Sequence, residues 1–68
     1  MKQVSGRELA RVLLQRGWRL ARVHGSHHIL TMSGRRERIV IPVHGNRPLK
    51  LGLLRSLMKI ASLEESDL

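Results

Sequence analysis

The segment Gly25-Ser26-His27-His28 places two imidazole side chains directly after a turn of small residues. An imidazole titrates near neutral pH, so it can accept or donate a proton during a reaction. The chain that carries it has 13 lysines and arginines against 5 aspartates and glutamates, which gives a formal net charge of +8 at pH 7. A surface with this charge attracts phosphate groups. Together the two features predict proton-transfer chemistry on a nucleic acid.

RNA suits such chemistry because its 2′-hydroxyl group is a built-in nucleophile. Cleavage needs a group that removes the hydroxyl proton, a group that protonates the departing 5′ oxygen, and positive charge around the phosphorane. A histidine can serve as the base or the acid, a contribution that is typically worth about 10²–10⁴-fold in rate. Lysine and arginine can supply the positive charge, so we expect no metal ion and no other cofactor.

Length and composition exclude several other classes of protein. A chain of 68 residues is expected to form one domain, residues 1–68, which is too small for a deep cleft that would bind a small-molecule ligand. The absence of cysteine excludes disulfides and thiolate zinc sites and fits the reducing cytoplasm. The first residues lack the apolar stretch of a signal peptide, and no run approaches the roughly 20 apolar residues of a membrane span. We therefore expect a cytoplasmic protein with no membrane partner.

The first predicted element is a helix over residues 5–16. Ser5 and Glu8 have the spacing of a capping box, in which each side chain accepts a hydrogen bond from an amide that the helix start leaves unpaired. Gly17 is placed to end the helix. An apolar stripe at helical spacing lies between these signals, formed by Leu9, Val12 and Leu13.

Three short segments that favour strands follow, at residues 18–23, 27–32 and 38–43. The separators between them are short enough for hairpins, so the segments predict an antiparallel meander. Pro42 has no amide hydrogen to donate, which places it at an edge or at the end of its strand. Trp18 is the only aromatic residue, so we expect it to anchor the core rather than to stack on bases.

A second helix is predicted after Pro48, with an apolar stripe that packs on the sheet. Gly52 would cost about 1 kcal/mol relative to alanine in a helix interior, so we expect it near the start of this helix. Ser62 and Glu65 repeat the capping-box spacing and predict a short final turn over residues 63–67. The stripe consists of Leu53, Leu54, Leu57, Met58 and Ala61.

These elements predict an α+β fold of the order α-β-β-β-α. The three strands form an antiparallel sheet, and both helices pack most simply on one face of it. The opposite face of the sheet, or one of its edges, is then open to a ligand.

Five motifs lie in order along nearly the whole chain: Ser5-Gly6-Arg7-Glu8-Leu9, Gly17-Trp18, Gly25-Ser26-His27-His28-Ile29-Leu30, Ile41-Pro42-Val43-His44 and Leu49-Lys50-Leu51-Gly52-Leu53-Leu54-Arg55. This succession resembles the HicA toxins of type II toxin-antitoxin systems. The resemblance implies a fold like the double-stranded RNA-binding domain, endoribonuclease activity on mRNA, and inhibition by a HicB-type antitoxin. It also implies that His27 is catalytic. The chain departs from the family at Leu51, where a lysine that could bind phosphate is more common.

Other residues of the site are predicted from charge and position. His28 has the opposite side-chain direction to His27, so we expect it to pack beneath the sheet with Leu30 and Met32. His44 is either a turn residue or a second acid that protonates the leaving group. The residues expected to contact RNA are Gly25, Ser26, Arg22, Arg35, Arg36 and Lys50.

Three alternatives to a ribonuclease follow from the same residues. A non-catalytic RNA-binding module would explain the charge but gives no role to Gly25-Ser26-His27. A cationic protein of the membrane surface would need one strongly basic amphipathic helix, whereas the positive charges here are spread over the chain. A zinc site built from the four histidines is disfavoured, because no cysteine is present and adjacent side chains of a strand point apart.

Overall fold

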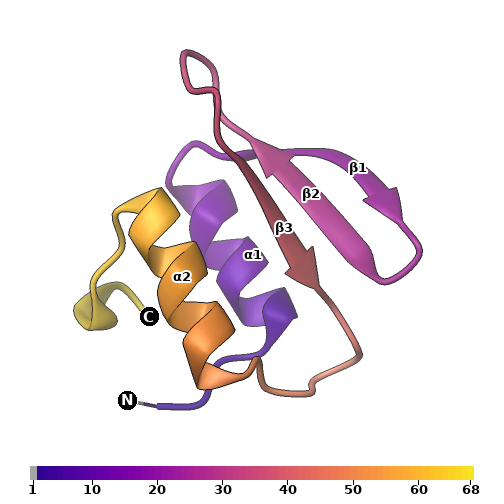
Figure 1. The fold of residues 1–68 in the computed structure, drawn as a ribbon, viewed down its shortest axis with the longest axis vertical. Helices are drawn as coiled ribbons and strands as arrows, with labels where there is room; N and C mark the ends of the chain where they lie inside the picture. The colour runs from indigo at the N-terminus through magenta and orange to yellow at the C-terminus, as the bar shows by residue number, and fades with distance from the viewer. Residues whose placement is uncertain (1) are drawn as a thin grey trace.

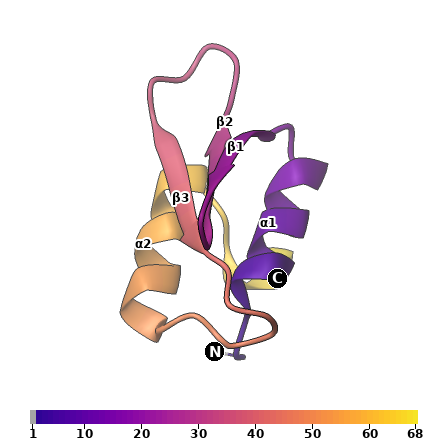
Figure 2. The same ribbon diagram turned by 90° about the vertical axis from the view of Figure 1, so that its right-hand side faces the viewer.

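The structure is a computed structural model that describes residues 2–68. Three strands form one antiparallel sheet in the order β1-β2-β3, and two helices cover one of its faces (Figure 1 and Figure 2). This is the predicted α+β fold with the order α-β-β-β-α. No helix within residues 2–68 combines the length and the apolar character needed to cross a bilayer. The elements are α1 (Gly6–Gln15), β1 (Arg19–His24), β2 (His27–Thr31), β3 (Arg38–Pro42), α2 (Leu51–Ala61) and a final 3-10 turn, η1 (Glu65–Asp67).

Helix α1 begins at the predicted capping box. The Ser5 hydroxyl accepts from the Glu8 amide at 3.1 Å, and the Glu8 carboxylate accepts from the Ser5 amide at 3.1 Å. The hydrogen bond from the Ser5 backbone amide, and after it one from the Ser5 side chain, lower the pKa of Glu8 below its ordinary value of 4.5. The helix ends at Gln15, Arg16 is its C-cap, and Gly17 turns the chain with a φ of +95°. The predicted boundaries are therefore confirmed.

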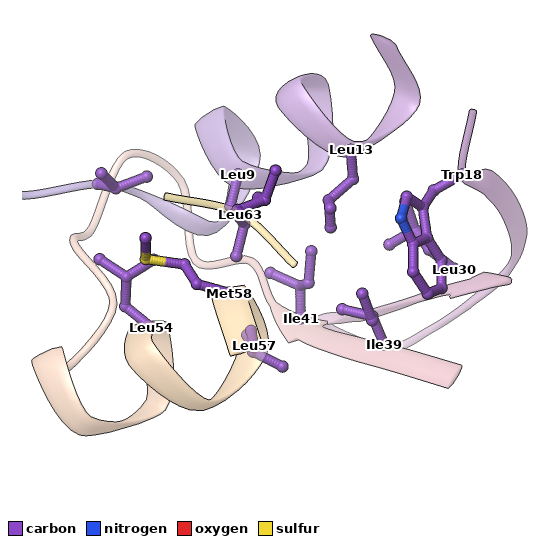
Figure 3. Packing of buried hydrophobic residues seen from close by; sticks show 11 residues of the cluster. Leu9, Leu13, Trp18, Leu30, Ile39, Ile41, Leu54, Leu57, Met58 and Leu63 are labelled. Atoms are coloured by element: carbon purple, nitrogen blue, oxygen red, sulfur yellow. The ribbon is translucent and has the colours of Figure 1, made fainter. Parts of the chain in front are cut away.

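The core lies between the sheet and the two helices (Figure 3). Leu30 of β2 and Ile39 and Ile41 of β3 face the helices and are fully buried. Trp18 is also buried, which confirms its expected place in the core, but it precedes β1 instead of opening it. The helices contribute Leu9, Leu13, Leu54, Leu57 and Met58, and two residues outside the helices, Val4 and Leu63, complete the core.

Helix α2 begins at Leu51, so Gly52 lies in its first turn as expected. The predicted cap of the final turn is wrong. Ser62 ends α2 in the left-handed conformation, with a φ of +57°, and in that place it cannot also start the next turn. The capping box is formed by Glu64 and Asp67 instead, with the Glu64 amide donating to the Asp67 carboxylate at 2.7 Å.

Gly6 lies where α1 crosses the end of β3. A Cβ atom at this position would lie 2.3 Å from the carbonyl oxygen of Pro42 and 3.0 Å from Cγ2 of Ile41. Contacts this short force either the helix or the strand to move. The glycine therefore lets the first turn of α1 lie directly on the end of β3, where Pro42 pairs with His27 of β2.

Gly6→Ala is expected to lower the free energy of unfolding by about 1–3 kcal/mol, because the gain in helix propensity is smaller than the cost of overpacking. The matched control is Gly52→Ala, where no atom lies within 4 Å of the added Cβ. That change should stabilise the protein by up to about 1 kcal/mol. Urea unfolding of both variants measures the difference. Equal effects of the two alanines would show that the contact with β3 is not tight.

Candidate active site

A two-residue turn joins β1 to β2 and places two histidines opposite each other. His24 and His27 flank the turn and form the last pair of the β1–β2 ladder. Gly25 has a φ of +61°, while Ser26 is not among the residues with positive φ, a pattern that matches a type II′ turn. Such a turn fits the natural twist of two strands, so the Gly-Ser sequence sets the pairing of the flanking histidines.

The side chain of His27 points to the face of the sheet that the helices leave uncovered. Residues directly opposite in an antiparallel ladder share a face, and that face alternates along each strand. Leu30, Ile39 and Ile41 define the inner face because they are buried under the helices. The same alternation, with the extra residue of the bulge between Leu20 and Arg22, gives the residues of the outer face. They are Arg19, Arg22, His24, His27, Ile29, Thr31, Arg38, Val40 and Pro42.

The outer face carries three arginines and two histidines but no carboxylate. Arg19 and Arg38 lie towards one end of the strands, and Arg22 lies between them and the histidine pair. All three arginines are exposed. A phosphate group that approaches His27 over this face therefore meets positive charge and no competing negative charge.

His27 also has a close neighbour on β3. It lies opposite Pro42, and the Val43 amide donates to the Ser26 carbonyl oxygen at 2.7 Å. These bonds make His27 and Pro42 a non-hydrogen-bonded pair, the kind in which side chains lie closest. The backbone nitrogen of a residue in such a pair does not donate to the partner strand. The missing amide hydrogen of Pro42 therefore costs no hydrogen bond to β2. Its place at the end of an edge strand confirms the prediction made from the sequence.

Both imidazoles of the turn are exposed to solvent. His24 and His27 are exposed side chains, and no side-chain hydrogen bond among residues 2–68 involves either ring. His28, in contrast, lies on the inner face opposite Ile41 and is half-buried. The predicted division of the adjacent histidines between the two faces is thus confirmed.

Lys50 lies in the segment between β3 and α2 and lines a hollow together with Pro42. A hollow of about 290 Å³ lies beside Pro42, with Lys50, His44 and Arg47 around it. Its apolar lining comes from two prolines and two leucines. Pro42, which lines this hollow, is the cross-strand neighbour of His27. His44 lies in the turn that follows β3, where its carbonyl oxygen accepts from the Arg47 amide at 3.0 Å.

Arg35 and Arg36 lie in the β2–β3 loop, at the end of the sheet opposite the β1–β2 turn (Figure 1). The four residue-to-residue steps from His27 to Thr31 alone span about 13 Å. Arg35 donates to the carbonyl oxygen of Ile60 at 2.8 Å and lies over the Trp18 ring at 5.3 Å. It thus connects the loop to α2 and the core. Arg36 is exposed.

His24 was not assigned to the site from the sequence, although His24 lies opposite His27 in the ladder. The sequence does contain a signal for this pairing, because a two-residue Gly-Ser turn places the residues on either side of it, His24 and His27, opposite each other. Arg19 and Arg38 were also not assigned to the site, because the bulge in β1 decides the face of Arg19 and the register of β2 with β3 decides that of Arg38. No group of three or more histidine, cysteine or acidic side chains that could hold a metal ion lies together among the described residues.

Comparison with known proteins gives one family. A family model described as the HicA toxin of bacterial toxin-antitoxin systems matches residues 6–63. A comparison with curated proteins gives no significant match. The matched range covers both helices, all three strands and the histidine turn.

Proposed function

The chain belongs to the HicA toxin family of bacterial toxin-antitoxin systems, and we propose that it is an endoribonuclease that cleaves mRNA with His27 as a proton-transfer group. The observation that carries this proposal is an exposed imidazole on a sheet face that bears Arg19, Arg22 and Arg38 and no carboxylate. This arrangement combines the two requirements of RNA cleavage, a titratable group and positive charge for the phosphate.

In the proposed reaction His27 removes the proton from the 2′-hydroxyl group of the RNA. The 2′ oxygen then attacks the adjacent phosphorus, and the 5′ oxygen of the next nucleotide leaves. Arg22 is the arginine nearest to the histidine pair along β1, and in this proposal it stabilises the negative charge that develops on the phosphorane. Gly25 and Ser26 form the turn over which the RNA backbone would pass, and Lys50 would bind a phosphate beside Pro42.

A toxin of this family acts with an antitoxin protein. We propose that the partner is of the HicB type and that it is acidic, because the toxin carries a net charge of +8. Expression of the neighbouring open reading frame together with this chain should restore growth that the chain alone inhibits. Because mRNA is the proposed substrate, we expect the toxin to act in the cytoplasm.

Incubation of the purified protein with a messenger RNA separates this proposal from a non-catalytic RNA-binding module. A ribonuclease produces new fragments whose amount grows with time. A binding module retards the RNA on a native gel and leaves its length unchanged on a denaturing gel. Retardation without fragments, at protein concentrations that saturate the RNA, would contradict the enzymatic function.

Binding of RNA should weaken steeply with salt, because each phosphate contact releases a counterion. Arg22→Gln and Arg36→Gln should each reduce the slope of log affinity against log salt by about one unit if the residue contacts a phosphate. Lys59→Gln is the matched control, since this exposed lysine belongs to α2, which covers the inner face. Arg35 is less suitable, because its replacement also removes the contacts to Ile60 and Trp18. Slopes that stay unchanged in both glutamine variants would make these arginines ordinary surface residues.

A further inference from the structure

The last pair of the β1–β2 ladder consists of two residues with the same proton-transfer chemistry. His24 and His27 lie directly opposite each other on the outer face. Directly opposite residues in an antiparallel pair have Cβ atoms about 4.5–5.5 Å apart. Rotation of the two rings about their side-chain bonds then allows one phosphate group to fit between the imidazole nitrogens. Cleavage through a 2′-hydroxyl group needs a base and an acid on the two sides of the same phosphorus.

We propose that His24 is a second catalytic residue of this site, the acid that protonates the leaving 5′ oxygen while His27 acts as the base. The inference rests on the proposed ribonuclease function and completes its proton transfers. Neutral His27 takes the proton of the 2′-hydroxyl group as the bond from the 2′ oxygen to phosphorus forms. Protonated His24 gives its proton to the 5′ oxygen as the bond from phosphorus to that oxygen breaks. The products are a 2′,3′-cyclic phosphate and a 5′-hydroxyl group, and exchange with water restores both histidines.

The surroundings of the pair favour this division of roles over other donors. The outer face presents Arg22 beside His24 on β1 and Pro42 beside His27 on β3, and Arg19 and Arg38 lie farther along the strands. None of these side chains can give up a proton near neutral pH. His44 is the other exposed imidazole near the site, but it lies in the turn after β3, beside the hollow next to Pro42. His24 is therefore the proton donor that the β1–β2 ladder places directly opposite His27.

The test uses an RNA oligonucleotide in which sulfur replaces the leaving 5′ oxygen at one cleavage site. A thiolate leaves without being protonated, so an enzyme that has lost its acid should regain activity on this substrate. His24→Ala is expected to lose about 10²–10⁴-fold in rate on ordinary RNA and to recover most of that loss on the sulfur-containing RNA. His27→Ala should stay inactive on both, because the 2′-hydroxyl proton must still be removed. His44→Ala should show no such recovery.

The pH dependence gives a second measurement. With a neutral base and a protonated acid, the rate rises and then falls as the pH increases. His24→Ala should lose the fall on the alkaline side and keep the rise on the acid side. Both histidine variants should keep the circular dichroism spectrum of the parent, because the two side chains are exposed.

Several outcomes would overturn the inference. One is full activity of His24→Ala on ordinary RNA, and another is an equal loss on both substrates. Recovery by His44→Ala would assign the acid to His44 instead. Each of these leaves the ribonuclease function in place, since the parent protein still cleaves. A parent protein that cuts neither substrate would overturn the proposed function and the role of His24 together.

Discussion

His27→Ala is expected to abolish RNA cleavage and growth inhibition while it leaves the fold intact. A group that transfers a proton in the transition state contributes typically about 10²–10⁴-fold to the rate, and an alanine cannot replace it. The side chain is exposed on the outer face, so its removal takes little from the core. The measurement is the rate of fragment release from a messenger RNA, together with growth of cells that express each variant at matched levels.

His28→Ala is the control from the neighbouring position. His28 is half-buried on the inner face opposite Ile41, so its truncation should lower stability while cleavage by the folded fraction persists. The pair of variants therefore separates loss of chemistry from loss of structure. Equal toxicity of His27→Ala and the parent, at equal protein levels, would remove His27 from the mechanism.

RNA that carries a 2′-O-methyl group on the nucleotide 5′ to the cut should resist cleavage completely. The proposed nucleophile is that hydroxyl oxygen, and methylation removes both its proton and its ability to attack. Cleavage of unmodified RNA should persist in excess EDTA, because an imidazole and the RNA's own hydroxyl group carry out the proposed step. The new ends should be a 2′,3′-cyclic phosphate and a 5′-hydroxyl group, which polynucleotide kinase labels without prior dephosphorylation.

The control for this experiment is an RNA methylated on the nucleotide 3′ to the cut. Its nucleophile is intact, so cleavage should continue at a rate near that of the unmodified RNA. If EDTA stops the reaction, or if the new 5′ ends already carry phosphate, a metal-activated water would be the better nucleophile. The role of His27 as the base for the 2′-hydroxyl group would then be wrong.

Local signals in the sequence are enough to predict most elements of this fold. The Ser5–Glu8 box, Gly17 and the period of the apolar residues place α1 within one residue of its observed ends. These signals act over one helical turn or one strand, and the structure keeps them because no tertiary contact opposes them. The alternation of side chains along β2 likewise separates His27 from His28 without any knowledge of the partner strands.

The cap of the final turn shows where a local signal fails. Ser62 has a capping-box spacing to Glu65, but the tertiary packing of α2 extends the helix through Ala61. The next residue then has to end that helix, and the capping role passes to Glu64. The end of α2 and the start of the next turn compete for one residue here, and the burial of Leu57 and Met58 favours the longer helix.

By itself the sequence determined the types and order of the elements, the direction of His27 and the excess of positive charge, because these depend on nearby residues and on composition. Only the tertiary structure decided which cations accompany the histidine. The bulge in β1 brings Arg19 to the face of His27, and the register of β2 with β3 brings Arg38 there, whereas Arg35 contacts Ile60 and Trp18 at the other end of the sheet. Register and loop contacts join residues far apart in the chain, and hydrophobic burial on the inner face sets them.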